Sequence, residues 1–294
     1  MHVPSPVLRA VTRAVVRPVL NDRLHPRHQR RIIDALSRFP VLPTGTVTEA
    51  RELGGRPALR ITTPASDPQR ALLFLHGGAY TSGSPISHRA LAAHLGDQAR
   101  AVGHLLDYRL APEHPYPAAV DDALAAYRDL LASGIPAERI AVAGDSAGGG
   151  LTLALVVRIK AEGLPLPCGL ALVSPWVDLA LTGLDESVRD PLLTRGWLER
   201  SAQSYAGTDR ARPEVSPIHA DLGGFPPMVI QGSSDEILVA DVERFVARAR
   251  EAGVEVDYER IEGAWHDLQL YAGTNRDATA AVARLGAWLG TRFA

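Results

Sequence analysis

The chain has 294 residues, of which 46 % are hydrophobic and 22 % are charged, and its formal net charge is −2. A chain of this length can bury a sizeable core without disulfides or metal ions, and a charge so close to neutral gives no reason to expect a nucleic-acid partner. The single cysteine, Cys168, excludes an internal disulfide and a cysteine-based zinc site. It lies in an apolar run, where we expect a buried strand thiol.

The first forty residues are rich in arginine and are predicted to form one or two amphipathic helices. The segment lacks the apolar stretch and the small-residue cleavage site of a secretory leader. No apolar run in the chain approaches the length of a membrane span. The sequence therefore predicts a cytoplasmic protein with no membrane span. The apolar positions near helical spacing are Val7, Leu8, Val11, Val15, Val16, Val19 and Leu20.

Short apolar strands and amphipathic helices alternate after residue 45. Unbroken apolar strands separated by helices indicate an α/β fold with a mostly parallel central sheet flanked by helices. Strands are predicted at residues 58–62, 71–75, 102–108, 140–143, 170–173, 228–231 and 254–261. Helices are predicted at residues 118–132, 151–159, 239–252 and 278–293.

Residues 176–226 interrupt this alternation, because they contain helix fragments and several prolines but no clear strand. An insertion of this length between two core strands is typical of a cap or lid. We therefore expect N-terminal cap helices in residues 1–45, a core formed by residues 46–175 and 227–294, and a cap insertion at 176–226. The insertion is expected to place apolar side chains over a site, among them Leu192, Leu193, Trp197, Leu198 and Tyr205.

The sharpest motif is Gly-Asp-Ser-Ala-Gly at Gly144 to Gly148, with a predicted strand before it and a predicted helix after it. This G-x-S-x-G pattern in a strand–turn–helix context indicates a nucleophilic serine, Ser146, on a sharp turn at a helix N-terminus. The alternative is a tight glycine turn with a capping serine. A phosphate-binding loop is disfavoured, because no Lys-Ser or Lys-Thr pair follows the glycines.

A second glycine motif, His-Gly-Gly-Ala-Tyr at His76 to Tyr80, follows directly on the predicted strand at 71–75. Acyl transfer needs two or three backbone N–H groups that converge on the developing oxyanion. We predict that the loop N–H groups of Gly77, Gly78 and Ala79 act together with that of Ala147. A simple strand-ending turn is the alternative for this motif taken alone.

A serine nucleophile requires a base, and the base requires a carboxylate that fixes its tautomer. Of the two histidines after Ser146, His266 follows the last predicted strand, whereas His219 lies in the expected cap insertion. Asp235 follows the strand at 228–231 and should reach the same carboxyl edge of the sheet. We therefore predict that Asp235 orients His266, with Asp241 as the competing acid.

Several motifs together resemble the hormone-sensitive-lipase-like branch of the α/β hydrolases: the His-Gly-Gly loop, the segment Tyr108–Pro117, the Ser146 motif, Ser174–Trp176 and Gly232–Asp241. The resemblance covers roughly residues 72–266. It implies an α/β-hydrolase fold, a carboxylesterase activity, a two-part helical cap made by the N-terminus and the insertion, and an acid in the loop after the strand, which favours Asp235. The family's usual third loop glycine is Ala79 here, which can still donate its N–H.

These observations predict a serine carboxylesterase that hydrolyses small to medium apolar esters or lactones through an acyl-enzyme, with Ser146, Asp235 and His266 as its triad. Tyr80, Trp176, Leu193, Trp197 and Tyr205 are the expected substrate contacts. No metal or organic cofactor is implied. The resemblance also allows acetyl hydrolases of natural products. The alternatives are an amidase or acetyl-amide hydrolase and a non-catalytic ligand-binding member of the same fold, and homodimer formation is left open.

Overall fold

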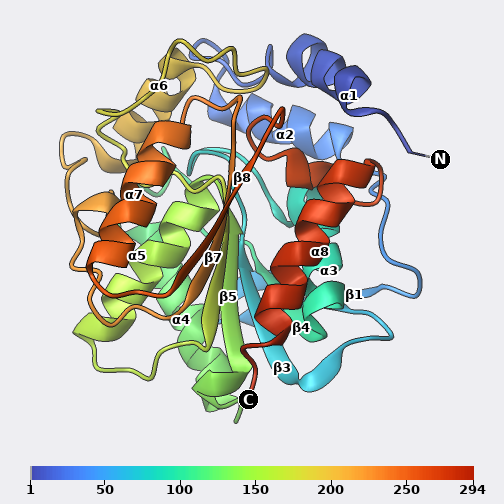
Figure 1. The fold of residues 1–294 in the computed structure, drawn as a ribbon, viewed down its shortest axis with the longest axis vertical. Helices are drawn as coiled ribbons and strands as arrows, with labels where there is room; N and C mark the ends of the chain where they lie inside the picture. The colour runs from blue at the N-terminus through green and yellow to red at the C-terminus, as the bar shows by residue number, and fades with distance from the viewer. Residues whose placement is uncertain (1) are drawn as a thin grey trace.

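One eight-stranded sheet runs through the computed structural model, which describes residues 2–294 (Figure 1). Its strand order is β1-β2-β4-β3-β5-β6-β7-β8. Strand β2 is antiparallel to both of its neighbours, and all other pairs are parallel, so the predicted mostly parallel sheet is confirmed. The strands are β1 Val47–Leu53, β2 Arg56–Thr62, β3 Asp67–Leu75, β4 Ala101–Leu106, β5 Ile140–Asp145, β6 Gly169–Val173, β7 Met228–Ser233 and β8 Val256–Ile261.

Helices cover both faces of the sheet. Alternate residues of the central strands pack into two separate hydrophobic cores, one on each face. Leu73 and Leu75 of β3 pack into the core under α4 (Ala118–Ala132), α5 (Ala147–Ala161) and α7 (Val239–Glu251). Leu72 and Phe74 pack into the opposite core, under α3 (Pro85–Ala99) and α8 (Arg276–Gly290) (Figure 1). This two-sided burial explains why the central strands are apolar throughout.

The structure contains a strand and a helix that the sequence pattern did not predict. Strand β1 lies at the edge of the sheet and buries only Leu53, so it lacks the alternation of a half-buried strand. Helix α3 is buried on several sides, and its buried residues include the polar His88 beside small alanines. Its apolar residues therefore do not gather on one stripe, which is the feature that reveals a helix in a sequence.

The half-buried Cys168 lies immediately before β6 and packs against the core under α8. Burial raises the pKa of its thiol to about 12.

Helices from both expected cap regions lie together beyond the sheet (Figure 1). The N-terminal part consists of α1 (Ser5–Val11), a π-helical turn at Thr12–Val16 and α2 (Pro26–Leu36), and the insertion contributes α6 (Arg195–Ala206). The two parts touch directly, since Trp197 Nε1 donates to Gln29 Oε1 at 3.2 Å. Short 3₁₀ turns lie at Ala137–Arg139, Pro217–His219 and Leu268–Tyr271. Within residues 2–294, no helix has the length and apolar character needed to cross a membrane.

Candidate active site

Ser146 lies on the sharp turn between β5 and α5, with φ 51° and ψ −120°. Two flanking glycines make this turn possible. A Cβ on Gly144 would lie 2.3 Å from the carbonyl oxygen of Gly148, and a Cβ on Gly148 would lie 1.9 Å from that of Leu75. The strand–turn–helix context expected for G-x-S-x-G is therefore present, and it holds the Ser146 hydroxyl at the carboxyl edge of the sheet.

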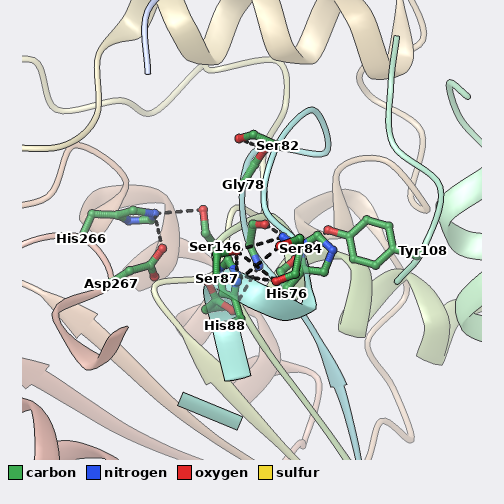
Figure 2. A network of polar contacts seen from close by, with 12 residues as sticks. His76, Gly78, Ser82, Ser84, Ser87, His88, Tyr108, Ser146, His266 and Asp267 are labelled. Carbon is green, nitrogen blue, oxygen red and sulfur yellow. Dashed lines mark hydrogen bonds and ion pairs between the residues drawn. The ribbon is translucent and has the colours of Figure 1, made fainter. Parts of the chain in front are cut away.

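His266, in the loop after β8, lies against the Ser146 hydroxyl (Figure 2). Its Nε2 is 2.9 Å from Ser146 Oγ, and its Nδ1 is 2.8 Å from Oε2 of Glu236. Glu236 is fully buried, and its second oxygen accepts the backbone N–H of Ser233 at 3.0 Å. The carboxylate therefore fixes the histidine ring in the orientation that a general base requires.

The predicted contact between Asp235 and His266 is absent, and the neighbouring Glu236 takes its place. The Asp235 carboxylate instead binds Arg9 Nη2 at 2.5 Å and accepts from the Ser234 hydroxyl at 2.8 Å. Successive residues in the loop after β7 point in different directions, and the sequence pattern placed the acid one residue too early. The competing acid Asp241 does not bind His266 either; its carboxylate pairs with Arg244 at 2.6 Å.

A second carboxylate that the sequence analysis missed lies beside the base. Asp267 Oδ2 is 3.1 Å from His266 Nε2, the atom that also faces Ser146 (Figure 2). Asp267 is buried and adopts a left-handed backbone with φ 55°, and burial raises the pKa of its carboxyl to about 6. Burial acts to lower the pKa of His266, but the carboxylates of Asp267 and Glu236 outweigh it and hold that pKa well above its usual value.

The glycine loop after β3 supplies backbone N–H groups next to Ser146. Gly78 has φ 113°, and a Cβ there would lie 2.2 Å from the carbonyl oxygen of Ser82, so the loop's path needs glycine. Gly77 was expected to face the oxyanion, but its N–H donates to Asp145 Oδ1 at 3.1 Å. Among the hydrogen bonds of residues 2–294, none uses the N–H of Gly78, Ala79 or Ala147. These three groups are available to a ligand.

Buried polar side chains hold this glycine loop from behind. Asp145, the second residue of the serine motif, binds the loop through Gly77 and lies 3.0 Å from Nε2 of His88. The Tyr108 hydroxyl donates to the backbone carbonyl of His76 at 2.6 Å, and the Tyr108 ring stacks on the imidazole ring of His76 (Figure 2). Asp145 has no role in the sequence prediction, although its place within the serine motif was a usable signal.

A cavity of about 360 Å³ extends from Ser146 and His266 to the outside. Leu193 and Trp197 line it, as predicted. The cavity wall also contains N-terminal and C-terminal side chains that the sequence analysis did not name as substrate contacts. They are Val11, Val15, Val16, Leu20, Ile33, Leu36, Phe39, Val41, Leu270 and Tyr271.

The other three predicted substrate contacts do not line this cavity. Tyr80 stacks on Tyr205 with ring centroids 3.9 Å apart, and Trp176 lies 6.3 Å from Tyr80. All three rings are buried. They pack residues 176–226 against the glycine loop after β3, so these rings belong to the hydrophobic core.

His219 is exposed and lies outside the cavity.

Within residues 2–294, no group of three or more His, Cys, Asp or Glu side chains is arranged to hold a metal ion.

Comparison with known proteins identifies relatives along nearly the whole chain. Residues 72–270 match a family described by the alpha/beta hydrolase fold. An acetyl-hydrolase of Streptomyces hygroscopicus is 44 % identical over 78 % of this chain and 78 % of its own, and an esterase of Acinetobacter venetianus is 37 % identical over 93 % and 92 %. The crystal structure of an esterase from the bacterial hormone-sensitive lipase family is 36 % identical, covers 99 % of this chain and 100 % of its own, and has a TM-score of 0.92. The chain therefore belongs to the alpha/beta hydrolase fold family, in its hormone-sensitive-lipase-like branch.

Proposed function

We propose that this protein is a serine carboxylesterase that acts through an acyl-enzyme on Ser146. The observation that carries the proposal is the hydrogen-bonded chain from Glu236 through His266 to Ser146 at the inner end of an apolar cavity. Nucleophile, base and orienting carboxylate are the three parts that acyl transfer by a serine requires. The esterase and acetyl-hydrolase names of the relatives point to the same reaction.

In the first half of the reaction, His266 Nε2 accepts the Ser146 proton as Oγ attacks the ester carbonyl carbon. The free N–H groups of Gly78, Ala79 and Ala147 stabilise the negative charge on the carbonyl oxygen. The protonated His266 then donates to the alcohol oxygen, which leaves. In the second half, water attacks the acyl-enzyme with the same base, and Glu236 keeps the proton on Nδ1 throughout.

The cavity favours small to medium apolar acyl or alcohol groups. Its apolar walls come mostly from residues 11–41, with Leu192, Leu193 and Trp197 from the insertion and Leu270 and Tyr271 from near the C-terminus. Apolar contact contributes about 0.8 kcal/mol for each buried CH₂ group. A lactone presents the same ester carbonyl in a ring, so a panel of linear esters, lactones and amides compared on one enzyme preparation would rank these substrate classes.

The test of the proposal is Ser146→Ala together with a fluorophosphonate probe. The natural protein should bind the probe covalently and hydrolyse p-nitrophenyl butyrate, and the variant should do neither, with kcat lower by about 10⁴ or more. The far-UV circular dichroism of the two proteins should match. Normal turnover by a folded variant would rule out Ser146 as the nucleophile.

We also propose that residues 1–45 and 176–226 form one cap over this cavity, which their side chains support by lining it together. The cytoplasmic location and the homodimer stay predictions.

A further inference from the structure

Exposed large hydrophobic side chains are concentrated in the N-terminal part of the cap. Seven of the nine in residues 2–294 lie between residues 7 and 41, so they form a local surface rather than a scatter. Phe39 is 91 % exposed, Leu36 and Val7 are 51 % exposed, and Val41 is 50 % exposed. An exposed apolar surface concentrated in one segment is typical of an interaction site.

The same segment carries a charge opposite to that of the rest of the chain. Residues 1–40 contain eight arginines and two aspartates, which gives +6, whereas the other 254 residues contain 23 basic and 31 acidic residues, which gives −8. The near-neutral total therefore conceals a basic cap on an acidic body. Such a separation attracts a negatively charged surface to one face of the molecule.

Apolar and basic side chains lie on opposite sides of the first cap helix. Val7, Val11 and Val15 recur every four residues and are all exposed, and Val11 and Val15 line the mouth of the active-site cavity. Arg13 is exposed on another side of the same helical segment and lines a separate groove with Arg9 and Arg17.

The second cap helix and the segment that follows it repeat the pattern. Ile32, Leu36 and Phe39 are exposed, and Leu36 and Phe39 line the same cavity. Arg27 and Arg31 are exposed on this helix. Within residues 2–294, the guanidinium groups of Arg13, Arg27 and Arg31 take part in no ion pair, whereas Arg9 pairs with Asp235 and Arg30 with Glu113. Arg13, Arg27 and Arg31 are therefore free to pair with the negative charges of a partner.

We propose that this face of the cap docks on an anionic lipid surface and thereby places the mouth of the active-site cavity against the lipid. Apolar side chains flanked by arginines are the arrangement with which a surface helix lies in a lipid–water interface. Five of the seven exposed apolar side chains line the cavity that contains Ser146: Val11, Val15, Leu36, Phe39 and Val41. A fluid surface accommodates separate protruding side chains such as Phe39 without a rigid complementary pocket.

The experiment is co-sedimentation of the full-length protein with vesicles of pure phosphatidylcholine and with vesicles that contain about 30 % phosphatidylglycerol. The protein should bind the anionic vesicles, and about 0.5 M salt should release most of it because salt screens the charges. The double variant Arg13→Glu/Arg31→Glu should bind about thirtyfold more weakly or worse, since each basic residue near the membrane contributes about fivefold. Its hydrolysis of water-soluble p-nitrophenyl acetate should be unchanged.

The matched control is Arg100→Glu/Arg250→Glu, which changes the net charge equally. Both residues are exposed and precede the starts of β4 and β8, at the edge of the sheet opposite the cap. This control should bind vesicles like the natural protein, and so should the inactive Ser146→Ala. Phe39→Ala should reduce the binding that persists at high salt.

Three results would overturn the proposal. The first is failure of the natural protein to bind anionic vesicles at low salt, and the second is an equal loss of binding in the Arg100/Arg250 control. The third is a change of oligomeric state in the cap variant without any change in vesicle binding, which would assign the face to a second copy of the chain.

Discussion

Two adjacent carboxylates, the partly exposed Asp235 and the buried Glu236, have different partners and should respond differently to loss of charge. Glu236→Gln preserves the shape of the side chain but removes the acceptor that fixes the His266 tautomer. We expect kcat for p-nitrophenyl butyrate to fall by about 10⁴, the size of effect seen when a triad carboxylate becomes an amide. Asp235→Asn serves as the control and should keep most of the activity, because it loses only a partly exposed pair with Arg9. A larger loss of kcat in Asp235→Asn than in Glu236→Gln would instead identify Asp235 as the acid.

We expect Asp267 to influence the pH at which His266 becomes neutral and can act as the proposed base. His266 must be neutral to accept the Ser146 proton, so kcat/KM should rise as the pH rises through the pKa of His266. Although burial acts to lower that pKa, the negative charge of Asp267 helps to raise it. Asp267→Asn removes that charge, and the acid limb of the kcat/KM profile should therefore move to lower pH.

The exposed Glu262→Gln provides a control for the pH profile, since this carboxylate is 75 % exposed and its charge is screened by solvent. Its acid limb should coincide with that of the natural protein. If the acid limb of the kcat/KM profile stays at the same pH in Asp267→Asn and only the plateau value falls, Asp267 acts through packing and does not influence the pKa of His266.

At this scale the sequence analysis paired Ser146 with His266, which the structure places 2.9 Å apart, but it missed the carboxylates beside His266. Ser146 and His266 are recognisable because their motifs and strand positions constrain the backbone directly. The choice between Asp235 and Glu236 depends on which way each side chain leaves a loop, and Arg9, more than 200 residues away, binds the one that the pattern favoured. Such a contact between distant residues leaves no trace in a local pattern.

Helix α2 contacts the glycine loop after β3 as well as lining the cavity. Arg30 donates to the carbonyl of Thr81 at 2.8 Å and to that of Ala111 at 2.7 Å. Arg30→Met should keep the aliphatic stem but release the loop, and kcat for a short ester should fall by about tenfold to a hundredfold, as expected when catalytic groups shift by about 1 Å. Stopped assays with p-nitrophenyl acetate would measure kcat of the variant and of the natural protein.

His28→Ala is the control on the same helix, because His28 is exposed and does not line the cavity. It should leave kcat unchanged. If Arg30→Met changes only KM for long acyl chains, the helix covers the cavity without positioning the loop.

Elements with a clear period were predicted within a few residues, whereas those whose burial comes from the surrounding structure were not. The predicted helix at 118–132 coincides with α4. Helix α3 is enclosed between the sheet and α8, so its sequence lacks one polar face and one apolar face. Leu193 and Trp197 line the cavity while Tyr205, on the same α6, turns inward onto Tyr80. Apolar residues in a cap insertion can face a ligand or the core, and composition does not distinguish the two.

Over the whole molecule, the mostly parallel character of the sheet follows from a pattern that the sequence displays. Continuous apolar strands require cover on both faces, and the intervening helices supply it. The hairpin of β1 and β2 is less visible, because an exposed edge strand needs no apolar face. The separation of a basic N-terminal segment from an acidic remainder is present in the sequence, but it becomes meaningful only because the fold places residues 2–40 at one end of the molecule (Figure 1).

The position of Cys168 makes the folded protein a poor target for thiol reagents and the unfolded protein a good one. Burial raises the pKa of this thiol to about 12, so little of it is ionised near pH 8, and the thiolate is the reactive form. Ellman's reagent should therefore react slowly until the core under α8 opens, and its uptake in increasing urea should follow the loss of circular dichroism. A cysteine introduced at an exposed cap position could then carry a fluorophore selectively, with the native thiol left unlabelled.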